Sequence, residues 1–213
     1  MCFTQAEIDA VYRAIYSRRD MRHFSGGTIE PEQLQRFLQA AHAAPSVGFM
    51  QPWRFIRITD TDIRRRLQDL VEEERCRTAR ALNEREDEFM RLKVEGVGEC
   101  AEVLVVCLTH NREPYIFGRR TLPQMDLASA ACAIQNLWLA ARAENIGMGW
   151  VSIFDPRKLA ELLHLPEGAE AIAILCLGPV EQFYDKPMLE MEGWDSRRNL
   201  DSLLMENAWQ DGG

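Results

Sequence analysis

The chain has 213 residues, of which 46% are hydrophobic and 27% are charged. This ordinary globular composition excludes a disordered chain, and the length predicts a single domain over residues 1–213. The net charge of −8 argues against polyanionic partners, so we expect neither nucleic-acid nor membrane-surface binding. The first residues lack the basic and apolar regions of a signal peptide, and the apolar runs are too short to cross a bilayer, which predicts a cytoplasmic protein.

Two helices and a strand are predicted at the N-terminal end. Thr4 with Glu7 matches the capping-box pattern and opens a helix that reaches about Ser17. Pro31 stands at a first-turn position, and the apolar residues that follow it recur at helical spacing. Trp53–Thr59 is rich in aromatic and β-branched residues, which favours a strand.

The segment from Asp60 to about Lys93 is dense in arginine and glutamate, and its apolar residues recur at helical spacing. It is therefore predicted to be helical. Two interpretations of its role are open: a solvated helical hairpin, which the residues alone favour, and a mobile cover over a site.

The C-terminal half alternates between predicted strands and helices. Val103–Thr109 is a continuous apolar run typical of a buried strand. From Gln124 to about Glu144 the pattern is helical and apolar almost all round, which predicts burial in a core or in an oligomer interface. The sequence then predicts a strand at Trp150–Phe154, a helix opened by Asp155–Pro156, and a last strand at Glu170–Leu177. About four strands among five or more helices make an α+β fold.

The six cysteines form no C-x-x-C pair and have no histidine beside them at metal-ligand spacing. We therefore expect reduced thiols and no metal site. A glycine-rich turn of the dinucleotide type and a P-loop are both absent from the sequence, which disfavours ordinary Rossmann and kinase-like folds.

A cluster of arginines follows the first predicted helix. Arg18, Arg19 and Arg22 precede a glycine turn in an otherwise acidic protein. Arginine forks bind phosphate in a bidentate manner, and a helical turn would aim Arg18 and Arg22 at one anion. The alternative is a solvated basic cluster that favours the C-terminus of the helix, and taken alone the arginines favour this alternative.

Two further stretches combine groups that suit a ligand site. Ala44–Phe55 is a loop that enters a strand and brings together hydroxyl, amide, thioether and aromatic groups. The alternative is a turn whose tryptophan anchors the core. Gly147–Phe154 carries glycines, which either permit close approach of the backbone to a ligand or simply end the preceding helix.

In this order and spacing the three stretches resemble the flavin-dependent nitroreductases. Members of that family carry a short Arg-rich segment, a P-S-x-x-N-x-Q-P-W-like loop and a buried Q-N-L-x-L-A-A helix, which is matched here by Gln135–Ala141. A glycine-rich turn with its strand follows, and then a basic residue near the C-terminus, here within a predicted extension over residues 180–213. The resemblance runs from about Val11 to Arg198.

The resemblance implies a nitroreductase-like central sheet of about four to five strands flanked by helices, and an intertwined homodimer. Two FMN molecules would sit at the interface, each contacted by both subunits. It further implies that Arg18, Arg19 and Arg22 hold the FMN phosphate and ribityl chain. Arg198, or its neighbour Arg197, would close the phosphate site from the tail.

The same resemblance implies contacts to the flavin ring. Ser46, Met50 and Gln51 would reach the flavin from the partner subunit. The strand Val151–Ile153 would lie along the isoalloxazine, where its backbone can contact the central ring.

Departures from the common family pattern point to one branch of the family. Asp20 replaces the usual serine of the Arg-rich segment, Phe49 replaces the usual asparagine of the loop, and Ser152 is a further difference on the flavin-facing strand. With these residues the chain resembles the 5,6-dimethylbenzimidazole synthases, the flavin-consuming branch. That resemblance implies that reduced FMN is the substrate and that dioxygen fragments it to 5,6-dimethylbenzimidazole, for the lower ligand of cobalamin, and erythrose 4-phosphate.

In such an enzyme Asp20 would act as general base or acid during ring breakage, and Ser152 would position the flavin by hydrogen bonding. This chemistry needs a site closed to water, which shifts the preference for residues 60–95 towards a helical lid. A separate NAD(P)H flavin reductase would supply the reduced FMN. Two alternatives stay open: an NAD(P)H-dependent FMN nitroreductase or quinone reductase, and a flavin-binding protein without chemistry.

Overall fold

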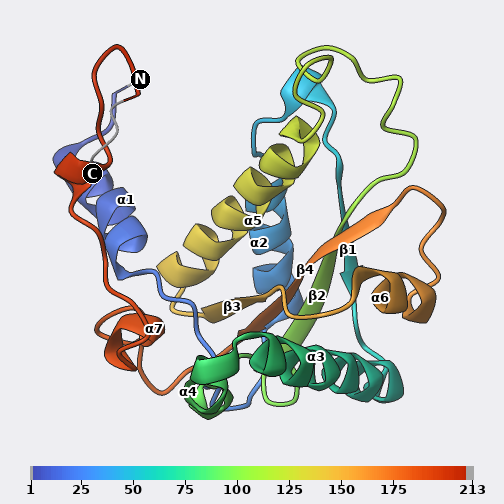
Figure 1. The fold of residues 1–213 in the computed structure, drawn as a ribbon. Coiled ribbons are helices and arrows are strands. Elements are labelled where there is room, and N and C mark those ends of the chain that lie inside the picture. The colour runs from blue at the N-terminus through green and yellow to red at the C-terminus, as the bar shows by residue number, and fades with distance from the viewer. Residues whose placement is uncertain (1, 210–213) are drawn as a thin grey trace.

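Four antiparallel strands form one sheet in the order β1-β2-β4-β3 (Figure 1). The computed structural model describes residues 2–209. The strands are β1 (Trp53–Arg57), β2 (Glu102–Leu108), β3 (Gly147–Val151) and β4 (Glu170–Gly178). Seven α-helices within residues 2–209 accompany the sheet, so the predicted α+β class is confirmed.

Side chains cap the N-termini of three helices, α1, α3 and α6. The reciprocal hydrogen bonds of the Thr4–Glu7 capping box are present before α1, and the Asp155 carboxylate accepts from two backbone N–H groups at the start of α6. The helices of residues 2–209 are α1 (Gln5–Ser17), α2 (Pro31–His42), α3 (Thr61–Ala81), α4 (Glu86–Arg91), α5 (Met125–Ala143), α6 (Pro156–Leu162) and α7 (Met188–Met191), with short 3₁₀ turns η1 (Val47–Phe49), η2 (Asn83–Arg85) and η3 (Leu200–Ser202).

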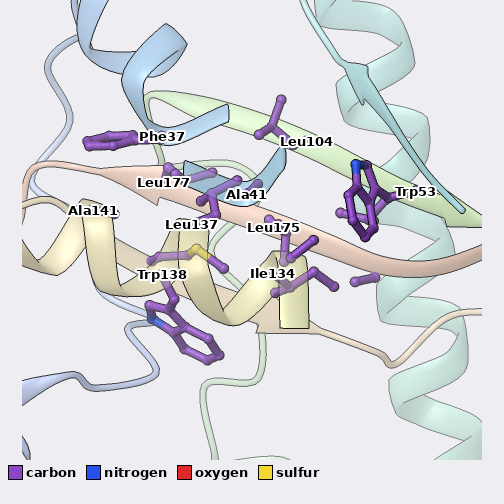
Figure 2. Packing of buried hydrophobic residues seen from close by; sticks show 14 of the residues in the cluster. Phe37, Ala41, Trp53, Leu104, Ile134, Leu137, Trp138, Ala141, Leu175 and Leu177 are labelled. Atoms are coloured by element: carbon purple, nitrogen blue, oxygen red, sulfur yellow. The ribbon is translucent and has the colours of Figure 1, made fainter. Parts of the chain in front are cut away.

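Helices cover both faces of the sheet, and each face has its own core. Along β2, Leu104, Val106 and Leu108 point into the core shared with α2 and α5, while the alternate residues point into the core shared with α3 and α6. Figure 2 shows the first core, where side chains of α2, α5 and the sheet pack together. Every residue of β2 is buried, as its continuous apolar run predicted.

The third strand departs from the prediction. It spans Gly147–Val151 rather than Trp150–Phe154, and α5 ends at Ala143, before the glycines. A Cβ at Gly149 would lie 2.2 Å from the carbonyl oxygen of Met21. The glycine is therefore required because another part of the chain passes close to β3, and it does not serve to end α5.

The predicted lid divides into two parts with different packing. The long helix α3 belongs to a core, since Leu67 and Val71 on it are completely buried. The shorter helix α4 and the residues after it contribute Phe89 and Leu92 to a separate, smaller apolar cluster, at the lower edge of the molecule in Figure 1.

The two ends of the chain leave apolar surface exposed. Helix α1 buries none of its residues, and Val11, Tyr12 and Tyr16 are each more than half exposed. After β4 the chain passes α4 and forms α7 before it turns back towards the N-terminal helix (Figure 1). Among residues 2–209, no helix combines the length and the apolar composition needed to cross a bilayer.

Candidate functional site

A cavity of about 320 Å³ lies between the segment after α1, the chain that follows β3, α4 and α7. These parts are far apart in sequence, and in Figure 1 α4 lies below β3 and α7 lies to its left. The lining residues are Arg18, Arg19, Asp20, Arg22, Phe89, Leu92, Val94, Ile153, Pro187, Met188, Leu189, Trp194 and Arg197.

The cavity combines an apolar wall with a group of cations. Phe89, Leu92 and Trp194 pack together in one apolar cluster. Arg18 and Arg197 line the cavity and also line an adjoining one of about 660 Å³. This combination suits a ligand that has a flat apolar part and an anionic end.

Asp20 is an anchored but partly exposed carboxylate in this cavity. One of its oxygens accepts from the Arg22 guanidinium at 2.6 Å and from the Trp150 backbone N–H at 2.9 Å, and the other accepts from Arg22 at 2.7 Å. The side chain remains 45% exposed, so part of it faces the cavity. Burial raises the pKa of Asp20, while Arg22, the Trp150 N–H and Arg18 oppose that shift.

Arg22 holds this arrangement from inside the fold. It also donates to the carbonyl oxygen of Trp150 at 2.8 Å, and its side chain is only 10% exposed. The prediction that Arg18 and Arg22 share a helical turn is wrong, because α1 ends at Ser17. The chain beyond is extended, and Asp20 forms a bridge with β3 that satisfies backbone groups outside the helix.

Arg18 lies between an aromatic ring and other cations. Its guanidinium carbon is 4.4 Å from the ring centroid of Trp138. Burial lowers the pKa of Arg18. The nearby Asp20 carboxylate opposes this shift, whereas the positive charges of Arg19 and Arg197 add to it. A bound anion would relieve the repulsion within this group of cations.

The other two basic residues predicted for the site differ in their placement. Arg19 lines the cavity and donates to carbonyl oxygens before it in the chain and in the C-terminal extension. In the tail it is Arg197 that lines the cavity, while its neighbour Arg198 is exposed and is not among the described lining residues. Of the two tail arginines, the structure therefore favours Arg197.

The residues predicted to lie along the flavin also differ in their placement relative to the cavity. The strand ends at Val151, which is buried in the core shared with α3 and α6. Ile153, beyond the strand, lines the cavity, whereas the intervening Ser152 is exposed and absent from the described lining. The prediction of a strand over Val151–Ile153 is thus wrong, because the pairing of β3 with β4 begins at Gly147 and ends at Val151.

The loop with Ser46, Met50 and Gln51 lies at the other end of α5. The backbone N–H of Val47 in this loop donates to the Ser129 hydroxyl oxygen at 3.0 Å. The Trp138 indole N–H, nine residues later in the helix, donates to the carbonyl oxygen of Arg19 in the Arg-rich segment. These two contacts are about 13 Å apart along the helix axis. Met50 and Gln51 line a separate cavity, so one chain does not bring this loop to the arginines. That it reaches a flavin from a partner subunit stays a prediction.

Sequence reasoning missed the apolar wall, above all Phe89, Leu189 and Trp194. A signal was present, because Phe89 and Trp194 are large apolar residues in segments that are otherwise dense in charge. Helical periodicity alone could not show that two segments about a hundred residues apart share one cluster.

Comparisons with known proteins agree with this architecture. The nitroreductase family model matches residues 15–179. A 5,6-dimethylbenzimidazole synthase of Rhodospirillum rubrum is 41% identical over 185 residues, which are 85% of this chain and 87% of the relative. One of the same name from Rhodobacter capsulatus is 36% identical over 91% of this chain and 95% of the relative.

Solved structures show the same fold at lower identity. The NADPH:FMN oxidoreductase of Vibrio harveyi, solved with NAD⁺, superposes with a TM-score of 0.74 at 23% identity, over 96% of this chain and 80% of that one. On the family match and on the extent of its similarity to the two synthases, the chain belongs to the nitroreductase family, in the branch of the 5,6-dimethylbenzimidazole synthases.

Proposed function

We propose that this protein converts reduced FMN and dioxygen to 5,6-dimethylbenzimidazole and erythrose 4-phosphate, for the lower ligand of cobalamin. The observation that carries the proposal is Asp20, a partly exposed carboxylate within a cavity that joins an apolar wall to a group of arginines. Similarity to two synthases over most of their length supports the choice of reaction.

The residues present fit FMN, which has a flat ring at one end and a phosphate at the other. Arg18, Arg19 and Arg197 would hold the phosphate, because all three line both adjoining cavities. Arg22 would support the same end, although it donates chiefly to Asp20 and Trp150. The apolar wall would lie against the ring. When bound in its reduced form, FMN would supply the ring that reacts with dioxygen.

Asp20 would hold or move a proton at the ring. Arg22 and the Trp150 N–H fix the carboxylate, and its exposed part leaves acceptor capacity for a substrate N–H. A pKa raised by burial brings the carboxyl group nearer to the pH at which it can exchange a proton. Ser152 would help to orient the substrate by hydrogen bonding once the site is complete.

We also propose a homodimer that completes the site. Ser46, Met50 and Gln51 lie away from the arginines of their own chain, so they would contribute to the cavity of the partner subunit. The exposed apolar residues of α1, among them Tyr12 and Tyr16, supply a surface that a second copy would cover.

Closure and supply of substrate complete the proposal. Within residues 60–95, α4 and the residues after it would act as the lid, because Phe89, Leu92 and Val94 border the cavity. Excluding water would keep outside protons from the reacting ring. A separate cytoplasmic NAD(P)H flavin reductase would deliver the reduced FMN.

The test is product analysis after one exposure to air. Protein is incubated with excess FMN, the flavin is reduced chemically, air is admitted and the products are identified by mass spectrometry. We expect dimethylbenzimidazole from the wild type and from Asp69→Asn, a control in an exposed part of α3, and none from Asp20→Asn. A parallel reaction contains NADPH in place of the chemical reductant, and intact flavin with steady NADPH oxidation there would instead support a nitroreductase. Tight FMN binding without either reaction would support a binding protein.

A further inference from the structure

The C-terminal extension contacts the lid, α4 and the residues after it, through one aromatic residue, Trp194. The guanidinium carbon of Arg85 lies 3.5 Å from the ring centroid of Trp194, and an Arg85 N–H donates to the Trp194 carbonyl oxygen at 3.0 Å. Arg85 is itself oriented by Glu88, at 2.7 Å. One arginine at the start of α4 therefore holds both the ring and the backbone of a residue that lies more than a hundred positions later.

The other face of this contact belongs to the cavity. The rings of Trp194 and Phe89 lie 6.1 Å apart, and both residues line the cavity. The apolar cluster around them reaches Ile153 beyond β3 and the buried Ala79 of α3. Trp194 is thus a wall of the cavity on one side and the attachment point of the lid on the other.

This attachment is built from contacts that can open. The Arg85 side chain is 44% exposed, so its contacts with Trp194 are open to water and depend on the geometry of the planar guanidinium. The lid itself is short, since α4 spans only Glu86–Arg91. A segment of this length depends on tertiary contacts for its helical structure.

We propose that Arg85 is a positioning residue that fixes Trp194 against α4, so that the lid and the C-terminal extension close the cavity as one unit. The inference deepens the proposed function and rests on it in one respect: closure decides how much reduced flavin is fragmented. In an open site the competing reaction is reoxidation, in which one reduced FMN and one dioxygen give one FMN and one hydrogen peroxide, with two electrons and two protons passing to oxygen.

The first measurement is amide hydrogen exchange of residues 83–94 in the full-length protein without flavin. Arg85→Met keeps the length of the side chain and removes the cation, and Arg91→Met is the matched control, since Arg91 is an exposed residue on the same helix. We expect exchange in residues 83–94 to be faster by about fivefold or more in Arg85→Met and unchanged in the control. Equal exchange in all three proteins would overturn the proposal.

The second measurement is the molar ratio of dimethylbenzimidazole to hydrogen peroxide after air is admitted. We expect the ratio to fall by about fivefold in Arg85→Met, and by a similar factor in Trp194→Ala. Trp194→Phe should retain part of the wild-type ratio, because a smaller aromatic ring still fits between Arg85 and Phe89. The double variant Arg85→Met/Trp194→Ala should lower the ratio no further than either single variant, because each single substitution already removes the contact between Arg85 and Trp194. Independent, multiplicative effects would contradict the shared role.

The two measurements separate the inference from the proposed function. A wild-type protein that makes no dimethylbenzimidazole refutes the function, yet amide exchange still tests the attachment of the lid. A wild-type protein that makes the product, with a ratio that Arg85→Met leaves unchanged, refutes the inference and leaves the function standing.

Discussion

Asp20 and Asp126 are both held by arginine side chains, but the surroundings of the two carboxylates differ. Asp126, at the start of α5, contacts Arg112 at 3.0 Å and Arg119 at 2.9 Å, and all three side chains are at most 10% exposed. Asp20 is held by the buried Arg22 and by one backbone N–H, and remains 45% exposed. The first is a closed charge cluster, and the second is open on the side that faces the cavity.

The difference separates a structural carboxylate from a functional one. The closed cluster ties the loop before α5 to the helix, because Arg119 also donates to carbonyl oxygens of that loop. Its carboxylate is surrounded by cations of its own chain, whereas Asp20 keeps exposed surface for a ligand. Asp126 also lies in the first turn of α5, where a negative charge stabilises the helix, and its burial between two arginines agrees with a structural role.

The largest effect is expected from Asp126→Asn. The substitution removes the buried carboxylate between two guanidinium groups, although Arg112 keeps a second partner in Glu170 at 2.7 Å. The free energy of unfolding should fall by about 3–5 kcal/mol. Urea unfolding followed by circular dichroism measures it, with Asp69→Asn as the exposed control. A loss below 1 kcal/mol, as expected for a surface pair, would break the distinction drawn between the two carboxylates.

Arg18→Ala should act on binding rather than on folding. Removing a charged hydrogen-bond donor from the phosphate end should weaken FMN binding by about 1.5–3 kcal/mol. Flavin fluorescence titration measures the dissociation constant, and Arg157→Ala on the exposed side of α6 serves as the control. Unchanged affinity would remove Arg18 from the proposed phosphate site and would leave that cation group without a ligand.

Asp20→Asn should lower the free energy of unfolding little, by about 1 kcal/mol or less, because the Asp20 side chain is 45% exposed and the asparagine oxygen can still accept from Arg22. The sign of its pH dependence follows from the raised pKa. The folded protein holds this proton to higher pH than the unfolded chain, so the stabilising contribution is fully present below the unfolded pKa of about 3.9 and is lost as the pH rises. In thermal melts the stability of the variant relative to the wild type should therefore increase as the pH rises above about 4. A relative decrease would contradict a raised pKa of Asp20.

The smallest effect on stability is expected at the ion pair between Arg36 and Glu144, which is more exposed than the pair of Arg22 and Asp20. Glu144 at the end of α5 accepts from Arg36 of α2, chiefly through a hydrogen bond that lowers the pKa of Glu144. Its contribution is present above the unfolded pKa of about 4.3 and is lost as the pH falls through the folded value. Glu144→Gln should lower the melting temperature by about 1–3 °C at pH 7 and by less at pH 3. The same decrease at both values would show that the charge is irrelevant.

The local elements followed from the sequence because their causes are local. The Thr4–Glu7 box, Pro31 and Asp155 start helices through contacts within one turn. The continuous apolar run of β2 predicted burial on both faces. The ordered motifs indicated the family, and the substitution at Asp20 indicated the branch.

Only the tertiary structure decided what those residues do together. Arg22 turns inward to bind Asp20 because the extended segment passes beside β3, and Gly149 is needed to make room for it. Trp194 contacts Phe89 and Arg85, which lie more than a hundred residues earlier in the chain, and helical or strand periodicity does not predict contacts over that distance. Periodicity and capping are fixed by neighbours in sequence, whereas a cavity depends on where distant segments pack, and that is determined by the burial of the whole core.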